Sequence, residues 1–142
     1  MTQTQTKRVE PLFIDGAAFS SFAVNDLEKA KDFYGNVLSL KVNEGDMGIL
    51  ELTIDGGNPI MIYPKGDHRP ATFTVLNFPV DNIAAVVSAL KGRGVTFETY
   101  DDLEGMVPDQ YGIYHSAEVG KGPNIAWFTD PAGNILSVLE KP

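Results

Sequence analysis

The stretch Phe22-Ala-Val-Asn-Asp-Leu-Glu-Lys-Ala30 is followed later in the chain by a second copy of its pattern, Phe78-Pro-Val-Asp-Asn-Ile-Ala-Ala-Val86. Each copy places an aromatic residue and a valine before residues that cap helices, and then an apolar residue that begins a helix. This order predicts a strand that runs into a helix, twice. An internal repeat of this kind indicates a fold built from two similar modules.

The first module is expected to have the order βαβββ. We predict a strand over 17–24, and Asn25 with Glu28 has the form of a helix N-cap with its capping-box partner. Apolar residues then recur at helical spacing: Leu27, Ala30, Phe33, Tyr34, Val37 and Leu38. Three more strands are predicted over 40–44, 48–54 and 59–63, with a hairpin turn at 55–58.

The second module repeats this order with a long insertion. We predict a strand over 71–80, a helix capped by Asp81 that ends at Gly92 and Gly94, and a strand over 95–100. A looser stretch over 101–123 follows. The last two strands, 125–129 and 135–139, flank Asp130-Pro-Ala-Gly-Asn134, which we interpret as turn chemistry alone.

Residues 1–15 are interpreted as an N-terminal arm, and 16–142 as a single domain with modules at 16–64 and 70–142. One module alone would leave a face of its sheet uncovered, and 142 residues suffice for one sizeable core. The expected fold class is therefore α+β, in which two βαβββ modules pair into a curled mixed β-sheet with helices on the outer face.

Composition excludes several classes of function. The chain has no cysteine, which removes disulfides and thiolate chemistry, and its net charge of −8 disfavours nucleic-acid binding. It has no apolar run of the ~20 residues that a membrane helix needs. The first eight residues lack the apolar core of a signal peptide, so we expect a cytoplasmic protein without a membrane partner.

Two motifs resemble the vicinal oxygen chelate superfamily, which includes glyoxalase I, bleomycin resistance proteins and extradiol dioxygenases. They are Val24-Asn-Asp-Leu-Glu-Lys-Ala-Lys-Asp-Phe-Tyr-Gly-Asn-Val-Leu38 and Trp127-Phe-Thr-Asp-Pro-Ala-Gly-Asn-Ile-Leu136. The resemblance implies paired βαβββ modules over nearly the whole chain past residue 16, and it implies a homodimer. The superfamily hosts many chemistries, so the resemblance is specific for fold rather than activity.

Enzymes of that superfamily hold a divalent metal with His, Gln or Glu side chains on the first and last strands of each module. By position, the resemblance places these sites on Phe19, Met61, Val75 and Ser137. This set lacks the donors that zinc or octahedral oxygen sites require. We therefore expect no metal site and no cofactor.

Strand alternation places a second set of side chains on the inner face of the sheet, where a small-molecule ligand would lie. The expected ligand-binding residues are Phe19, Ser21, Met61, Tyr63, Phe73, Val75, Asn77, Trp127 and Ser137. The competing interpretation is that these residues simply fill the core. Trp127, the only tryptophan, is the residue that would stack on a planar or cationic ligand.

Histidine is the usual general base near neutral pH, and this chain has two. His68 lies in the turn between the modules, where a solvated surface histidine is favoured. His115 lies in the insertion and is the weak catalytic candidate. Glu51 and Glu118 are interpreted as outward-facing carboxylates rather than site residues.

The leading hypothesis is a metal-independent small-molecule-binding protein of the glyoxalase/bleomycin resistance type, which sequesters a hydrophobic or cationic compound such as an antibiotic. The alternative is a lyase, isomerase or dioxygenase-like enzyme with a displaced metal site, or with metal-free acid–base chemistry through His115, Tyr111 or Tyr114. A third hypothesis is a regulatory or structural dimer whose cavity is only core.

Overall fold

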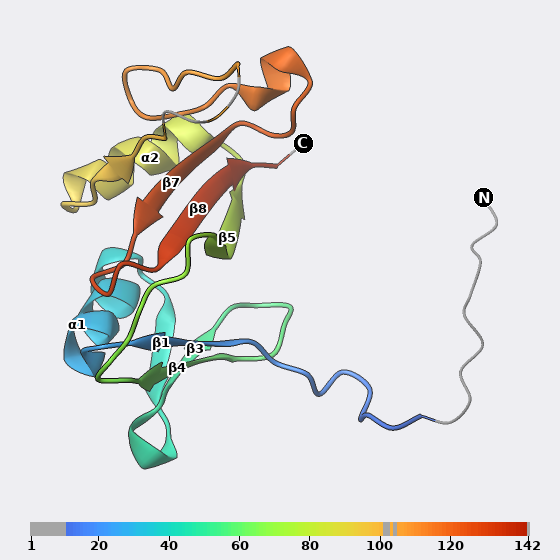
Figure 1. Ribbon diagram of the computed structural model, residues 1–142, viewed down its shortest axis with the longest axis vertical. Helices are drawn as coiled ribbons and strands as arrows, with labels where there is room; N and C mark the ends of the chain where they lie inside the picture. Colours follow the sequence, from blue (N-terminus) through green and yellow to red (C-terminus); the bar gives the residue numbers. More distant parts are fainter. Residues whose placement is uncertain (1–10, 101–102, 104, 142) are drawn as a thin grey trace.

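Two strand–helix–strand modules follow one another in the computed structural model, which describes residues 11–100, 103 and 105–141 (Figure 1). The first module contains β1 (Ser21–Val24), α1 (Leu27–Asp32), a π-helical turn (Phe33–Val37), β2 (Lys41–Glu44), a short 3-10 turn (Asp46–Gly48), β3 (Leu50–Thr53) and β4 (Ile60–Pro64). The second contains β5 (Thr74–Val80), α2 (Ile83–Gly92), β6 (Phe97–Glu98), a 3-10 turn (Ser116–Val119), β7 (Ile125–Thr129) and β8 (Ile135–Glu140).

Each module forms its own four-stranded mixed sheet. The strand orders are β1-β4-β3-β2 and β5-β8-β7-β6, and in each sheet the first two strands are parallel while the rest are antiparallel. The α+β class and the repeated βαβββ order are thus confirmed. The two sheets do not close into a barrel, and the described strands of one sheet do not pair with those of the other.

Both helices begin one residue later than the sequence pattern predicted. The N-cap of α1 is Asp26, whose carboxylate accepts a hydrogen bond from the Lys29 amide at 3.1 Å. The N-cap of α2 is Asn82, whose side-chain oxygen accepts from the Ala85 amide at 3.1 Å. The predicted caps at Asn25 and Asp81 were therefore wrong. In each copy two cap-type residues stand side by side, and the extended backbone of the second one decides which of them caps.

Several strands are shorter than predicted. β1 begins at Ser21 and β5 at Thr74, so Phe19 and Phe73 precede their strands, and β6 is reduced to Phe97–Glu98. The proposed arm lies mostly outside the described residues; of its last five, Leu12, Phe13 and Ile14 are each more than 80% exposed. No helix in the described part of the chain has the length and apolar character needed to cross a membrane.

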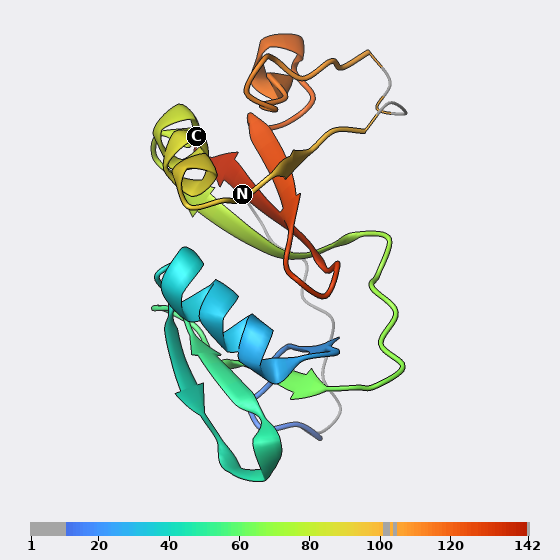
Figure 2. The same ribbon diagram turned by 90° about the vertical axis from the view of Figure 1, so that its left-hand side faces the viewer.

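The modules share one hydrophobic core. Helix α1 packs on β4 and helix α2 on β8, and apolar residues from both helix-covered faces belong to a single cluster. Phe33 of the first module contacts Phe128 of β7, with ring centroids 6.3 Å apart. The apolar residues beneath the two helices therefore form one continuous core, both helices lie on the same side of the molecule (Figure 1 and Figure 2), and the opposite face of each sheet carries neither α1 nor α2.

The turn between β7 and β8 joins the modules by polar contacts. Asp130 is 4% exposed; its carboxylate accepts hydrogen bonds from the Ala132 and Asn134 amides and, at 2.7 Å, from the Tyr34 hydroxyl. The side-chain amide of Asn134 donates to the Ala23 carbonyl at 2.9 Å. The turn expected at 130–134 is present, but it also holds the first module in place.

Tyr34→Phe is expected to lower the free energy of unfolding by about 1–3 kcal/mol, because it removes a buried hydrogen bond to a charged group. Burial and the charge of Asp130 raise the pKa of Tyr34 above its ordinary value, so the hydroxyl remains a donor at all physiological pH values. Urea denaturation measures the loss. Tyr111→Phe, at a residue 53% exposed, is the control and should leave stability unchanged. Equal stability of wild type and Tyr34→Phe would contradict this role.

Candidate functional site

The open face of the second sheet carries a row of three of the expected ligand-binding residues. Asn77, Ser137 and Trp127 are direct neighbours across β5, β8 and β7. The Ser137 hydroxyl donates to the Asn77 side-chain oxygen at 2.6 Å. Ser137 is fully buried and Asn77 is exposed. Neither belongs to the shared apolar core, and Ser137 is the direct neighbour of Trp127.

Trp127 is the centre of an aromatic pocket. Its ring makes edge-on contacts with Tyr100 and Tyr114, with centroids 5.5 and 5.2 Å away, and its indole N–H donates to the Thr74 hydroxyl at 3.0 Å. The pocket has a volume of about 250 Å³. It is lined by Thr72, Phe73, Thr74, Tyr100, Leu103, Trp127 and Ile135. Burial and the charge of Glu98 raise the pKa of Tyr100, which keeps the phenol neutral.

Thr74 reaches Trp127 because β5 is irregular. The pairing of β5 with β8 shifts register between Thr74 and Leu76, and a shift of one residue exchanges the faces on which side chains lie. Val75 packs against the shared core and lines a groove between the modules, together with Tyr63. Simple alternation along this strand had placed Val75 on the same face as Trp127 and Thr74 on the other, so Thr74 was not among the expected site residues. Tyr100, which follows β6, was not among them either.

The first sheet holds the remaining expected residues. Ser21 of β1 lies beside Met61 of β4, and Met61 lies beside Glu51 of β3. Phe19 is 60% exposed just before β1. We expected all nine ligand-binding residues to line one enclosed space, but within the chain the open sheets distribute them over two faces and the groove between the modules.

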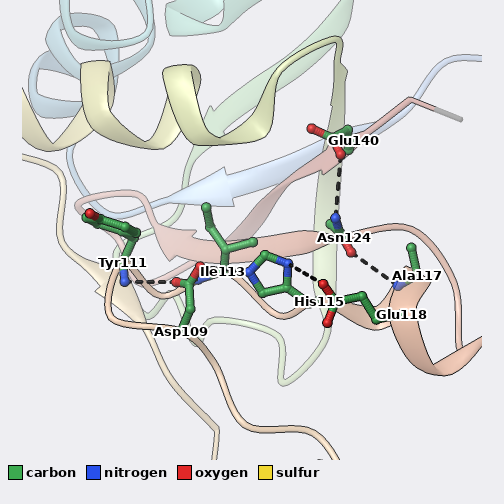
Figure 3. Close-up of polar contacts among 8 residues, drawn as sticks. All are labelled: Asp109, Tyr111, Ile113, His115, Ala117, Glu118, Asn124 and Glu140. Atoms are coloured by element: carbon green, nitrogen blue, oxygen red, sulfur yellow. Dashed lines mark hydrogen bonds and ion pairs between the residues drawn. The ribbon is translucent and has the colours of Figure 1, made fainter.

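The insertion is fastened by a carboxylate–imidazole pair (Figure 3). His115 Nε2 lies 2.8 Å from a carboxylate oxygen of Asp109, and its Nδ1 lies 3.9 Å from Glu118. The other Asp109 oxygen accepts hydrogen bonds from the Tyr111 and Ile113 amides. Burial tends to raise the pKa of Asp109, but hydrogen bonds from His115 and these two amides together hold that pKa below its ordinary value.

A second set of contacts ties the insertion to the sheet and to α2. Asn124 accepts a hydrogen bond from the Ala117 amide, and its own amide group lies 3.5 Å from a Glu140 oxygen. The other Glu140 oxygen accepts from the Ile83 amide at the start of α2, at 3.1 Å. His115, in contrast, contacts Asp109 and Glu118, which belong to the insertion itself, so it stabilises the fold of the insertion.

The two tyrosines considered for acid–base chemistry differ in access. Tyr114 is fully buried, and its hydroxyl accepts a hydrogen bond from the Tyr100 amide at 2.6 Å. Tyr111 is 53% exposed, with the Lys91 ammonium 5.5 Å from its ring centroid. Tyr114 therefore supports the wall of the Trp127 pocket, while Tyr111 lies on the surface over α2.

A profile of the Glyoxalase/Bleomycin resistance protein/Dioxygenase superfamily matches residues 16–138. The chain belongs to this superfamily. No curated protein matches the sequence. Solved structures agree in fold: the fosfomycin resistance protein FosX from Listeria monocytogenes is 16% identical with a TM-score of 0.65, and the match covers 92% of this chain and 96% of that one.

Two further structures of the superfamily fold are similar. The antibiotic-binding protein TnmS3 from a Streptomyces species is 20% identical, with a TM-score of 0.60 and coverage of 92% and 100% of the two chains. A superfamily member from Sphaerobacter thermophilus is 22% identical, with a TM-score of 0.57 and coverage of 88% and 98%. Identities at this level establish the fold and leave the function open.

The four positions to which the resemblance assigns the metal carry residues that do not suit a metal ion. The four positions carry Phe19, Met61, Val75 and Ser137, and the Ser137 hydroxyl is engaged with Asn77. Among the residues that the structure describes, no group of three or more His, Asp or Glu side chains is arranged to hold a metal ion. We therefore derive no chemical step through a metal.

Asp109→Asn is expected to lower the melting temperature by a few degrees at pH 7, because it removes the charge that pairs with His115. Since the pKa of Asp109 is lowered by folding, this stabilisation is complete above about pH 4 and is lost as the pH falls through the lower, folded pKa. The difference between wild type and variant should therefore shrink below pH 4 in thermal scans. Asp55→Asn, in an exposed turn, is the control. A difference that stays constant down to pH 2 would contradict the assignment.

Proposed function

We propose that this protein binds a small planar molecule, aromatic and neutral or cationic, without a metal, as a sequestering protein does with an antibiotic. The observation that carries the proposal is the pocket around Trp127. Its walls are aromatic and aliphatic, and its few polar groups, Thr72, Thr74 and the Tyr100 phenol, are the sparse orienting groups typical of small-molecule sites.

The charge of the protein supports a cationic ligand. The net charge is −8, and Glu98 lies directly beside Trp127 in the pairing of β6 with β7. A cation over an aromatic ring is attracted by the ring's quadrupole, and an adjacent carboxylate adds to that attraction. Two proteins of similar fold are a fosfomycin resistance protein and an antibiotic-binding protein, which supports a small-molecule ligand but says nothing of its charge.

The alternative is an enzyme of the superfamily, which would depend on His115. Both of its ring nitrogens face carboxylates, at 2.8 Å from Asp109 and 3.9 Å from Glu118, in contacts that fasten the insertion. This arrangement favours a structural histidine. We therefore propose binding rather than turnover.

Titration with N-methylquinolinium, a planar aromatic cation, should change the fluorescence of Trp127 saturably, since no other tryptophan contributes. Calorimetry gives the affinity. Phe73→Ala should weaken binding about tenfold, or about 1.4 kcal/mol, because Phe73 is a wall of the pocket. Phe13→Ala, at a still more exposed phenylalanine outside the pocket, should change nothing. The absence of saturable binding for N-methylquinolinium and for neutral quinoline would reject the proposal.

We also propose that two copies of the chain associate through the open faces of their sheets. Phe19, just before β1, and Phe73, just before β5, are 60% and 68% exposed, and large exposed apolar residues are typical of interaction surfaces. A second copy there would cover the Trp127 pocket. Light scattering should give a mass near twice 15.4 kDa, and Phe19→Asp should shift it toward the monomer. A monomeric mass at all concentrations would contradict the dimer.

A further inference from the structure

The segment that links the two modules builds a second pocket, separate from the one around Trp127. It connects β4 to β5 and runs past β1 (Figure 1). The Lys65 amide donates to the Val24 carbonyl at 2.9 Å, and the His68 amide donates to the Lys65 carbonyl at 3.0 Å. These bonds fold the segment into a turn against the first sheet.

The pocket has a volume of about 360 Å³ and both polar and apolar walls. It is lined by Phe22, Ala23, Tyr63, Lys65, Asp67, His68, Arg69, Ala71, Val75 and Asn134. Asn134 comes from the second module and donates to the Ala23 carbonyl, so the two modules together form the pocket.

The linker contributes three side chains with nitrogen donors to this pocket, Lys65, His68 and Arg69. It also contributes one carboxylate, Asp67, which pairs with the Lys65 ammonium at 2.6 Å. Arg69 makes no hydrogen bond or ion pair with another described residue in the structure. The guanidinium is therefore available, and a guanidinium with free N–H groups recognises carboxylate and phosphate oxygens in a two-pronged geometry.

His68 supplies the observation that points to a ligand. Its Nε2 atom is shielded from solvent and has no hydrogen-bond partner in the described part of the molecule. A buried polar atom without a partner is costly, and native structures satisfy nearly all such atoms with protein, water or ligand. A small rotation of the ring opens this atom to the pocket, where an imidazole N–H donates to an oxyanion and adds to the attraction from Arg69.

From these contacts we infer that the inter-module pocket binds a small organic anion. The oxyanion, a carboxylate, phosphate or phosphonate, lies between His68 and Arg69, and an apolar or aromatic part of the molecule lies against Phe22, Ala71 and Val75. This site does not depend on the proposed function. It is a locally basic pocket in a protein whose net charge is −8, so the selectivity for anions comes from the linker alone.

Calorimetry with phenylphosphonate and with benzoate tests whether the site binds an anion. Proton–nitrogen correlation NMR spectra of the two histidine rings show where the anion binds. Both probes should bind saturably and move the His68 resonances, while those of His115 stay in place. Inorganic phosphate, which lacks the apolar part, should bind at least tenfold more weakly. Phosphate that binds as tightly as phenylphosphonate would contradict the apolar half of the site.

Arg69→Gln should weaken phenylphosphonate binding at least tenfold, and His68→Gln should weaken it to a similar degree. Lys41→Gln removes one positive charge from an exposed strand residue outside the pocket, and it should bind as the wild type does. Phe73→Ala, which damages the Trp127 pocket, should also leave anion binding unchanged, so failure at one site is distinguishable from failure at the other. Unmoved His68 resonances, or wild-type affinity in Arg69→Gln, would overturn the inference.

Discussion

The hydrogen bond from the Tyr34 hydroxyl to the buried carboxylate of Asp130 fixes how the two halves of this protein meet. A carboxylate that is 4% exposed is tolerated only when its oxygens are satisfied. The turn supplies two amides and the Asn134 side chain, and the first module supplies the phenol. Displacing one module relative to the other would break this contact and leave a charge buried without its partners.

The remaining architecture depends on that contact. With the turn against the π-helical turn and β1, the helix-covered faces of both sheets share one core. The residues proposed to bind ligands lie outside this core, on the opposite faces and in the groove between the modules. The same docking brings Asn134 to Ala23 and so closes the floor of the pocket beside the linker.

The two pockets have opposite chemical character although one short segment separates them. Ala71 and Val75 line the basic pocket, whereas Thr72, Phe73 and Thr74 line the aromatic one. The register irregularity in β5 produces this division, because it moves Val75 out of the regular alternation and brings Thr74 to the indole of Trp127. The proposed cation would lie beside Trp127 and Glu98, and the inferred anion beside His68 and Arg69, so the two proposals concern separate sites of opposite charge.

The sequence by itself determined the repeated βαβββ order and the fold class, because hydrophobic periodicity and turn residues are local properties of the chain. The superfamily followed from the resemblance of two motifs. Strand alternation also placed Asn77, Ser137 and Trp127 on one face of the second sheet, where they are neighbours. Only the tertiary structure decided the caps at Asp26 and Asn82, the role of Asp130 between modules, the place of Val75 and the environment of His68. Each of these depends on residues far apart in the chain or on a one-residue shift of the backbone, and neither leaves a periodic signal in the sequence.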